Sequence, residues 1–464
     1  MLTDNFPSGG GLDINGYRGS NIINGDGTII NEGDIVQITP SHGIGGTGVQ
    51  LPDANGAYCT MLNMGNIHNP DTSVNYIFCA YSGANNMLTA CILKTQNGAW
   101  SVNNVTRVGV PTDAVLAGDP IKLYQVRNDC VLVVYGRGNP TGINAKCMHV
   151  IPDQSPGVDY IGQGSDYQIT AGNNTGFDVC GLDSEHFSHR VLICGLFAGN
   201  HYVVACRIQD FSITSIGTKL ATLPAMRSCA LSYIRPGQAY LACTLPSTNI
   251  VSDRVITVEG VTPTIYALVS GPQTTTIFQN GVLVLGISRL TEFTYVIHYF
   301  VPGLKFVASH TITVSGDPVT AINRLGFALQ GAGSDIGVGI GGFTINRETQ
   351  QIYGVVSYGT GNTSPSKDCF QGDAIGFNMS FAAYSRTALS GNQMLSCSIV
   401  QIAPYRCLIP KVNNAPPYIE IINADFVPVV SPWDFWKGTR PGVAITAGVG
   451  GDNRSVAVVT PFPN

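Results

Sequence analysis

The chain has 464 residues, of which 44% are hydrophobic and only 11% are charged, with a net charge of −5 at pH 7. Ordinary soluble proteins carry about 25% charged residues, so this surface must be polar but largely uncharged. The lack of a basic region argues against nucleic acid as a partner, and no run of about 18 apolar residues suggests insertion into a membrane.

Residues 1–33 differ in composition from the rest of the chain. They begin with MLTDNFPSGGG, are rich in Gly and Asn, and offer little to bury. The cationic start and apolar stretch of a secretory signal are missing, so we expect a protein that stays in the cytosol or leaves it inside an assembled particle. Two interpretations remain open: a disordered tail with a terminal strand, or an extended arm that lies on a neighbouring subunit.

From residue 34 onward, a β-hairpin pattern recurs. Runs of β-branched and aromatic residues are joined by short bends rich in Gly and Asn. Eight hairpins follow one another at a mean spacing of about 52 residues, and no useful length of helical periodicity interrupts them. The first apolar residues of the hairpins are Tyr76, Val131, Val191, Tyr240, Val282, Ile336, Met394 and Val443.

A spacing of about 40–55 residues built only from strands indicates a β-propeller. One four-stranded sheet cannot cover both of its faces, whereas stacking the sheets radially buries them. The last hairpin leaves its blade short of an outer strand, which residues 33–40 (GDIVQITP) can donate. We therefore predict an all-β fold: a single propeller of seven or eight four-stranded blades over residues 34–464, closed by an N-terminal strand, with residues 1–33 as an extended arm. A pair of stacked β-sandwiches is the alternative.

The thirteen cysteines follow the hairpins. Three residues after the first apolar position stand Cys79, Val134, Cys194, Cys243, Leu285, Gly339, Cys397 and Thr446. A small apolar residue that recurs at one blade position favours packing between sheets. Cys91 and Cys206 lie twelve residues after Cys79 and Cys194, roughly opposite them across a symmetric hairpin. Cross-strand disulfides and a metal site remain open, although no C-x-x-C spacing supports a metal.

Three segments contain residues of the types found in binding sites. GVGIGG, residues 337–342, matches G-x-G-x-x-G, but the sequence continues as a strand where a dinucleotide site needs a helix. Residues 183–190, DSEHFSHR, gather two carboxylates and two histidines in a loop, which is either a Zn²⁺ or Ca²⁺ site or a solvated polar loop. Trp433 and Trp436 either stack on sugar rings or close the edge of the last blade.

Propellers also include glycosidases, so carboxylate pairs deserve a search. The S-x-D-x-G-x-T-W box of sialidase-type propellers does not occur in the sequence, and the arginines show no clamp pattern. We therefore assign no catalytic, cofactor-binding or metal-binding residue and no cofactor, and we do not expect an enzyme.

The signal-less segment MLTDNFPSGGG, the low-charge strands and irregular hairpins such as CVLVVYG and GVLVLGIS resemble those of bacteriophage virion proteins built as β-propellers, found in tail nozzles, tail fibres and related attachments. The resemblance concerns organisation, and no residue-level role transfers from it. It implies a structural virion component, made in the host cytoplasm without a signal peptide, whose partners are other virion proteins and copies of itself.

Host attachment through a surface glycan is a further expectation, with no role for nucleic acid or membrane insertion. Irregular loops such as residues 357–377 would suit a subunit that meets several neighbours. The alternative is a glycan- or receptor-binding propeller of lectin type, and a carbohydrate-active hydrolase ranks below it.

Overall fold

A computed structural model describes residues 13–14, 17–24, 35–64, 74–84, 87–96, 99–107, 121–138, 141–154, 158–171, 176–197, 200–221, 228–245, 250–258, 268–277, 283–301, 306–317, 319, 321–331, 340–346, 351–359, 365–373, 381–388, 393–395, 398–403, 406–414, 417–432, 441–444 and 455–461. Within these ranges the chain forms β-strands and turns without any α-helix, which confirms the predicted all-β class. Accordingly, no helix in the described ranges is long and apolar enough to span a membrane.

Six antiparallel sheets of four strands each follow one another along the chain. Sheet 1 contains β4 (Ala54–Asn63), β5 (Val74–Gly83), β6 (Leu88–Gln96) and β7 (Ala99–Arg107). Sheet 2 contains β8 (Ile121–Arg127), β9 (Cys130–Gly138), β10 (Thr141–Gln154) and β11 (Val158–Ala171). Sheet 3 contains β12 (Phe177–Gly181), β13 (Arg190–Phe197), β14 (Asn200–Gln209) and β15 (Ser212–Ala221).

The next three sheets repeat this order. Sheet 4 contains β16 (Ser228–Arg235), β17 (Gln238–Leu245), β18 (Ile250–Val258) and β19 (Leu268–Ile277). Sheet 5 contains β20 (Leu283–Arg289), β21 (Thr294–Val301), β22 (Phe306–Ser315) and β23 (Ala321–Gly331). Sheet 6 contains β24 (Ile340–Asn346), β25 (Gln351–Gly359), β26 (Pro365–Asp373) and β27 (Phe381–Ala388).

A nine-stranded sheet, called here the terminal sheet, combines both ends of the chain. Its order is β1-β2-β33-β32-β3-β31-β30-β28, and β29 also pairs with β30. The strands are β1 (Asp13–Ile14), β2 (Tyr17–Asn24), β3 (Ile35–Gln50), β28 (Gln393–Leu395), β29 (Val400–Ala403), β30 (Arg406–Asn414), β31 (Pro417–Pro432), β32 (Pro441–Ala444) and β33 (Ser455–Pro461).

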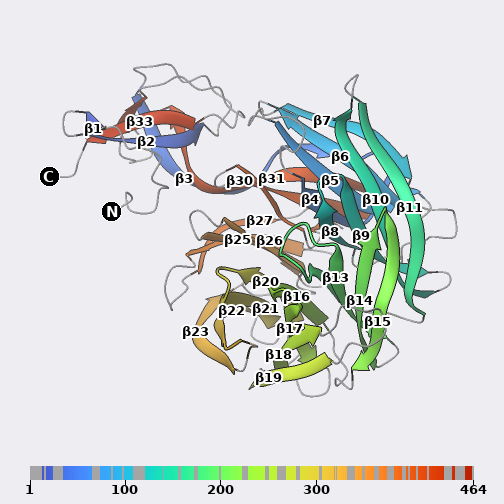
Figure 1. Cartoon of the computed structure of the whole chain (residues 1–464). Helices are drawn as coiled ribbons and strands as arrows, with labels where there is room; N and C mark the ends of the chain where they lie inside the picture. Colours follow the sequence, from blue (N-terminus) through green and yellow to red (C-terminus); the bar gives the residue numbers. More distant parts are fainter. Residues whose placement is uncertain are drawn as a thin grey trace.

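Neighbouring sheets meet through their first strands. β4 contacts β8, β8 contacts β12, and the series continues through β16 and β20 to β24. The terminal sheet lies between the two ends of this series, because β29 contacts both β24 and β4. In Figure 1 the colours accordingly run around a common centre from blue through green to orange. These contacts favour a single closed ring, which stays a prediction.

The strand predicted to come from the N-terminal end does pair with the C-terminal strands. β3 runs antiparallel to β31 from the pair Val36↔Pro432 to the pair Gln50↔Glu420, and its start also pairs with β32. The prediction for residues 33–40 is therefore confirmed for the described part that begins at Ile35. The strand is longer than expected, since it continues to Gln50 and brings the chain directly to sheet 1.

Three expectations from the sequence need correction. The hairpin that starts near Val443 forms no blade of its own, because β32 has only four residues and joins the terminal sheet beside β3. The predicted hairpins also change their place within the sheets along the chain. The hairpin that starts at Tyr76 begins in the second strand of sheet 1, whereas the hairpin predicted from Val282 begins next to the first strand of sheet 5. Within residues 357–377, expected as an irregular loop, β26 pairs along both edges with β25 and β27.

The described part of residues 1–33 pairs with the same chain. β2 runs antiparallel to β33 from Tyr17 to Ile23, and Ile23 and Asn24 also pair with β31. Residues 17–24 are therefore a terminal strand of this chain. The division of the chain into an arm and a propeller at residue 33 stays a prediction.

Sheets 1 to 4 each bury both of their faces against their neighbours. Successive side chains of a strand point to opposite faces, so β5 divides its apolar residues between two layers. Toward the terminal sheet point Ile77, Cys79 and Tyr81, and toward sheet 2 point Tyr76, Phe78 and Ala80. Burial on both faces explains why strands such as β5 read as continuous apolar runs.

The cysteines lie inside these layers. The three layers hold Cys59, Cys79 and Cys91 between the terminal sheet and sheet 1, Cys130, Cys147 and Cys206 between sheets 2 and 3, and Cys180, Cys194 and Cys243 between sheets 3 and 4. The eleven cysteines whose side chains the structure describes form no disulfide, and all of these except Cys229 are buried. Packing is therefore their role in this structure. Burial also raises the pKa of Cys206 to about 12, which leaves an unreactive thiol.

The detailed placement of the cysteines differs from the prediction. Cys79 and Cys91 are direct partners across β5 and β6, as expected. Cys194, however, pairs with Val203, and Cys206 pairs with Val191. The reason is that Phe197 pairs with Asn200, so the partner of Cys194 lies three residues before Cys206. Cys194 and Cys206 therefore lie on opposite faces of sheet 3, in different layers.

The pairing of β3 with β31 generates a prediction about stability. A variant that starts at residue 51 lacks β3, so β31 loses the partner to which it is bonded over most of its length. We expect this variant to unfold at least 10 °C below the full chain in a thermal melt followed by circular dichroism. A control variant that starts at residue 34 keeps β3 and should melt within a few degrees of the full chain. Equal melting temperatures for the two variants would contradict the role of β3.

Candidate functional site

The chain passes from β12 to β13 through residues 182–189, called here the crossing loop. It contains the polar cluster that the sequence singled out. Ser188 is buried in this loop, and its hydroxyl oxygen accepts hydrogen bonds from the backbone N–H groups of Leu182 at 3.2 Å and Asp183 at 2.9 Å. The hydroxyl group in turn donates to Oδ2 of Asp183 at 3.0 Å. The loop is therefore folded on its own side chains.

The crossing loop also bonds to sheet 2. The hydroxyl of Tyr124 on β8 donates to the carbonyl of Ser184 at 3.3 Å and accepts from the N–H of Ser188 at 3.2 Å. The N–H of Phe187 donates to the carbonyl of Gln125 at 3.2 Å. Gly181 is required at the start of the loop, because a Cβ there would lie 2.2 Å from both the Ser184 carbonyl oxygen and the Tyr124 hydroxyl oxygen.

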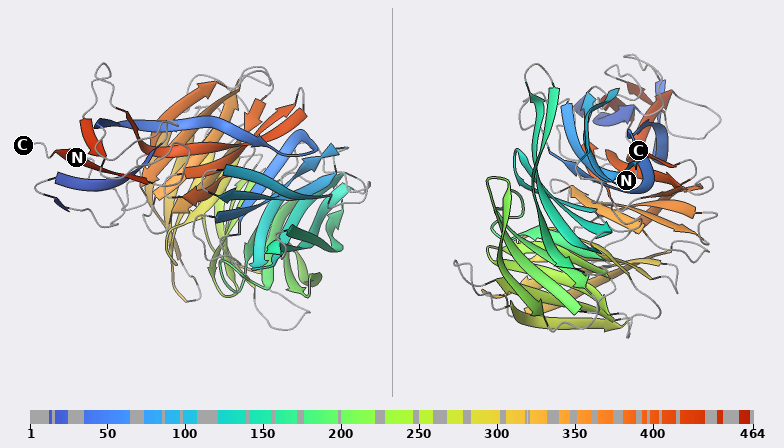
Figure 2. Two further views of the ribbon diagram at one scale, coloured as in Figure 1. Left: turned by 90° about the horizontal axis from the view of Figure 1, so that it is seen from above. Right: turned by 90° about the vertical axis from the view of Figure 1, so that its right-hand side faces the viewer.

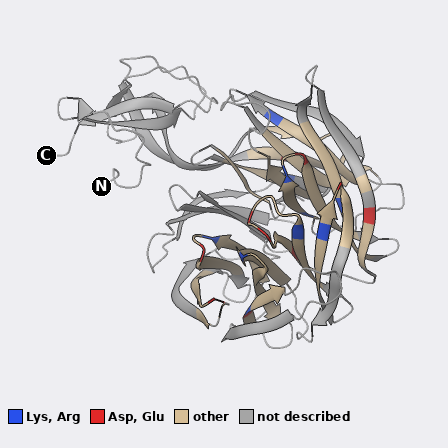
Figure 3. Ribbon diagram, viewed as in Figure 1, with Lys and Arg blue, Asp and Glu red and all other residues tan. Residues whose placement is uncertain are grey.

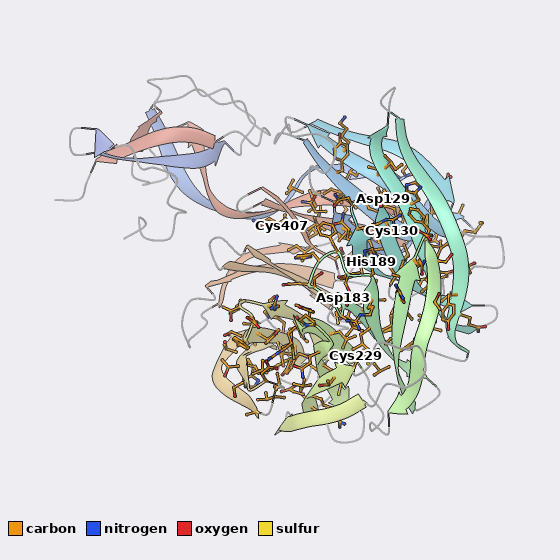
Figure 4. All side chains as sticks on the ribbon, viewed as in Figure 1. Asp129, Cys130, Asp183, His189, Cys229 and Cys407 are labelled. Atoms are coloured by element: carbon orange, nitrogen blue, oxygen red, sulfur yellow. The ribbon has the colours of Figure 1, made fainter. Side chains whose placement is uncertain are left out.

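On its other side the crossing loop reaches sheets 4 and 5. The hydroxyl of Tyr233 on β16 donates to the carbonyl of Asp183 at 3.3 Å, and Glu185 forms an ion pair with Arg289 on β20. Figure 4 places Asp183 near the middle of the molecule. The loop thus joins the first strands of sheets 2, 4 and 5.

The structure does not bring the four polar side chains of this loop together as metal ligands. Asp183 forms an ion pair with Arg190 and Glu185 pairs with Arg289, whereas His186 and His189 are exposed. Across the described ranges, no group of three or more His, Cys, Asp or Glu side chains is arranged to hold a metal ion. The two carboxylates instead serve to fix the crossing loop.

A pocket of about 280 Å³ lies beside the crossing loop, between sheets 2 and 3. Its walls come from the turn after β8, from the end of the crossing loop, and from the end of β14 with the turn that follows it. The lining residues that matter chemically are Arg127, Cys130, His189, Arg207, Asp210 and Phe211. Cys130 and His189 appear close together in Figure 4, from the two neighbouring sheets. The pocket combines cations, one carboxylate and one aromatic ring.

The turn that forms one wall of the pocket is strained. Gln209 pairs with Ser212, so Asp210 and Phe211 alone make the turn, with φ angles of +47° and +61°. Such a turn ordinarily takes Asn-Gly or Asp-Gly, and a bulky side chain at positive φ costs on the order of 1–2 kcal/mol. Strain of this kind collects at functional sites.

Contacts of Phe211 with sheet 2 hold the strained turn. The guanidinium of Arg127 lies over the ring of Phe211 at 4.4 Å from its centroid, and the ring of His149 lies 4.4 Å from it on a tilted plane. Asp129 binds both Arg127 and His149. The wall of the pocket is therefore fixed before any ligand arrives.

A Ser–His–Ser group in sheet 5 is the other arrangement of side chains that has the residue types of a catalytic site. His298 is fully buried, with Nε2 at 2.9 Å from Oγ of Ser288 and Nδ1 at 2.9 Å from Oγ of Ser309. Burial lowers the pKa of His298 to about 3. Because no solvent reaches this group, it stabilises the sheet and meets no substrate.

The remaining segments from the sequence analysis have plain outcomes. The described part of GVGIGG, from Ile340, is strand β24 paired with β25, which confirms that it opens no helix. Trp433 and Trp436 lie outside the described residues. The pocket residues Arg207, Asp210 and Phe211 were missed by sequence reasoning. The only signal was the short polar break QDFS between two apolar strands, since a turn with Phe at its second position resembles no hairpin rule.

Fold and site together define a β-propeller-type protein with a bonded loop at one end of the ring and a pocket between two blades. No protein-family model matches the sequence, and no curated protein matches it. Three solved structures resemble the chain at low similarity. They are Sqt1 of Chaetomium thermophilum bound to the N-terminus of ribosomal protein L10 (11% identity, 89% of this chain and 98% of that chain, TM-score 0.45), a mutant of AofleA from Arthrobotrys oligospora (8%, 74% and 92%, 0.41) and the WD40 domain of SCAP from fission yeast (7%, 85% and 99%, 0.40).

These likenesses are too distant to carry an argument about function. What the chain does has to be argued from its own residues.

The crossing loop yields a prediction with a matched control. Gly181→Ala forces a Cβ against the Ser184 carbonyl and the Tyr124 hydroxyl, so it should lower the free energy of unfolding by about 1–3 kcal/mol. Gly286→Ala adds the same methyl group where no atom lies within 4 Å, and we expect no loss of stability. Urea unfolding of both variants measures the difference. Equal effects at the two glycines would show that the crossing loop is not packed in this way.

Buried His298 predicts a pH dependence of stability. Its pKa is about 3 in the folded chain and about 6.5 when unfolded, so the unfolded chain binds the extra proton between these values. The contribution of His298 to the free energy of unfolding should therefore be fully present above about pH 6.5. It should fall by a few kcal/mol as the pH drops toward 3. His298→Gln should be less stable at pH 7 and show a weaker fall below pH 6.5. The exposed His189→Gln serves as the control and should keep the slope of the parent chain.

Proposed function

We propose that the protein is a non-catalytic structural component of a bacteriophage virion, in which the propeller is a rigid module and the terminal strands attach it to copies of itself and to other virion proteins. The virion setting rests on the resemblance in organisation described above. The attachment role rests on the arrangement of the terminal sheet.

The terminal strands project from the ring. β3 and β31 have 16 residues each, about 50 Å at 3.3 Å per residue, whereas the six four-stranded sheets use strands of 5 to 14 residues. The additional length carries β1, β2, β32 and β33 out to one side, as Figures 1 and 2 show. A projection built from both ends of the chain is a natural connector.

The edge of this projection supports attachment through strand pairing. One side of β2 is paired with β33 from Tyr17 to Ile23. The other side is paired with β1 only at Tyr17 and Arg18 and with β31 only at Ile23 and Asn24. In the part of the chain that the structure describes, the backbone of residues 19–22 has no strand on that second side. A sheet edge without a partner strand accepts a strand from another chain.

The sparse charge of the chain suits an assembly component. Lys, Arg, Asp and Glu are few on the described ribbon (Figure 3), and burying unpaired charge in an interface is costly. A non-catalytic role agrees with the use of Asp183 and Glu185 in the crossing loop and with the burial of His298. In the described ranges, these two carboxylates and this histidine are the side chains best suited to catalysis.

Light scattering at micromolar concentration tests the proposal. The full chain should form a defined oligomer, because the open edge of β2 pairs with a second copy. A variant that lacks residues 1–24 loses β1 and β2 and should be a monomer with an unchanged β-sheet spectrum. A control variant that lacks only residues 1–10 keeps both strands and should remain an oligomer. A full chain that is monomeric, or an oligomer that persists without β2, would contradict the attachment role.

A further inference from the structure

The pocket between sheets 2 and 3 carries an inference about ligand chemistry. We propose that it binds a small acidic sugar, with Arg207 holding the anionic group and Asp210 accepting hydrogen bonds from hydroxyl groups. This deepens the proposed function by giving the ring a ligand class for host attachment, and it involves none of the terminal strands.

Arg207 is the residue that favours an anion. It lies on β14 directly opposite Arg190 and next to Thr214 on β15. Arg190 is neutralised by Asp183, whereas no carboxylate of the described ranges is within ion-pair distance of the exposed Arg207. Arg207 therefore keeps its positive charge without a described carboxylate to balance it. An anion beside Arg207 would balance this charge and would meet a planar set of donors suited to carboxylate or phosphate.

The other charged residues of the pocket do not cancel the attraction of Arg207 for an anion. The charge of Arg127 is balanced by Asp129 at 2.5 Å, and its planar guanidinium lies over the ring of Phe211. His189 is exposed at the end of the crossing loop and adds a further ring nitrogen. Asp210 is the one acid among the lining residues. It stands on the strained turn, where a carboxylate is an acceptor for sugar hydroxyl groups.

Size and rigidity restrict the ligand to a single small ring. The volume of about 280 Å³ lies at the lower limit of ordinary ligand pockets, about 300–1,000 Å³. The wall that carries Asp210 is fixed, because Phe211 packs between Arg127 and His149. Gly164 on β11 permits this packing, since a Cβ there would lie 2.3 Å from the Phe211 carbonyl oxygen. A fixed wall reduces the ordering cost of binding.

Calorimetric titration of the full chain with four probes tests the proposal: glucuronate, glucose 6-phosphate, glucose and inorganic phosphate. We expect at least one of the two acidic sugars to bind at least tenfold more tightly than glucose and than inorganic phosphate. Glucuronate as the better ligand assigns a carboxylate, and glucose 6-phosphate assigns a phosphate ester. Failure of both acidic sugars to bind at millimolar concentration would overturn the proposal. So would inorganic phosphate that binds as well as the acidic sugars, since the pocket would then recognise only an anion.

Substitutions locate the binding. Arg207→Gln should weaken the better acidic sugar at least tenfold, and Arg207→Lys should weaken it less because the charge remains. Asp210→Asn should weaken the binding of the acidic sugar and should strengthen the binding of inorganic phosphate by no more than a few-fold. Lys94→Gln removes the same charge from sheet 1, outside the pocket, and should bind as the parent chain does. Parent-like binding by Arg207→Gln would place the sugar elsewhere and overturn the assignment.

This test is separate from the test of assembly. Arg207 and Asp210 are exposed, so their variants should melt with the parent chain and keep its native mass in light scattering. If the full chain forms the oligomer but binds neither acidic sugar, only the ligand assignment is wrong. A monomeric full chain that still binds the acidic sugar removes only the attachment role of the terminal strands.

Discussion

Burial of a sheet on both of its faces is the constraint on which the rest of this structure depends. A four-stranded sheet with apolar residues on both faces, such as sheet 1 with Tyr76 on one side and Ile77 on the other, is stable only between two neighbours. Sheets 1 to 4 meet this condition in the described residues, and β29 of the terminal sheet contacts both β24 and β4. The cysteines are a consequence, because small apolar side chains fill the narrow layers between sheets.

Burial of the strands leaves the strand ends and the sheet edges as the places where the chain can act. At one end of the ring the crossing loop uses Asp183, Glu185 and Ser188 to join three sheets, so its polar residues serve the architecture. Beside it, the turn of Asp210 and Phe211 accepts backbone strain to form the wall of a pocket. At the margin of the molecule, the long strands β3 and β31 carry a small sheet with an open edge. The proposed ligand pocket therefore lies beside the crossing loop, and the proposed connector lies in the terminal sheet.

The sequence predicts the class of fold well because period-two patterns and regular spacing are local signals. It also predicts the pairing of β3 with the C-terminal strands, since a last blade without an outer strand needs a donor. It cannot set hairpin registers: one pairing, Phe197 with Asn200, moves Cys194 and Cys206 to opposite faces. The pocket was beyond reach, because Arg127 and Arg207 are 80 positions apart in the sequence and meet only through the packing of sheets 2 and 3. The ion pair of Glu185 with Arg289 is hidden for the same reason.

Cryo-electron microscopy of the assembled full chain tests the central claim most directly, namely that a single ring is joined to its neighbours by the terminal strands. The account predicts particles in which each chain forms one closed ring of seven sheets and in which density between chains lies at β1, β2, β32 and β33. Open or paired sandwiches in place of a ring would contradict the fold. Rings that meet through the end with the crossing loop, with the terminal strands free, would contradict the proposed attachment.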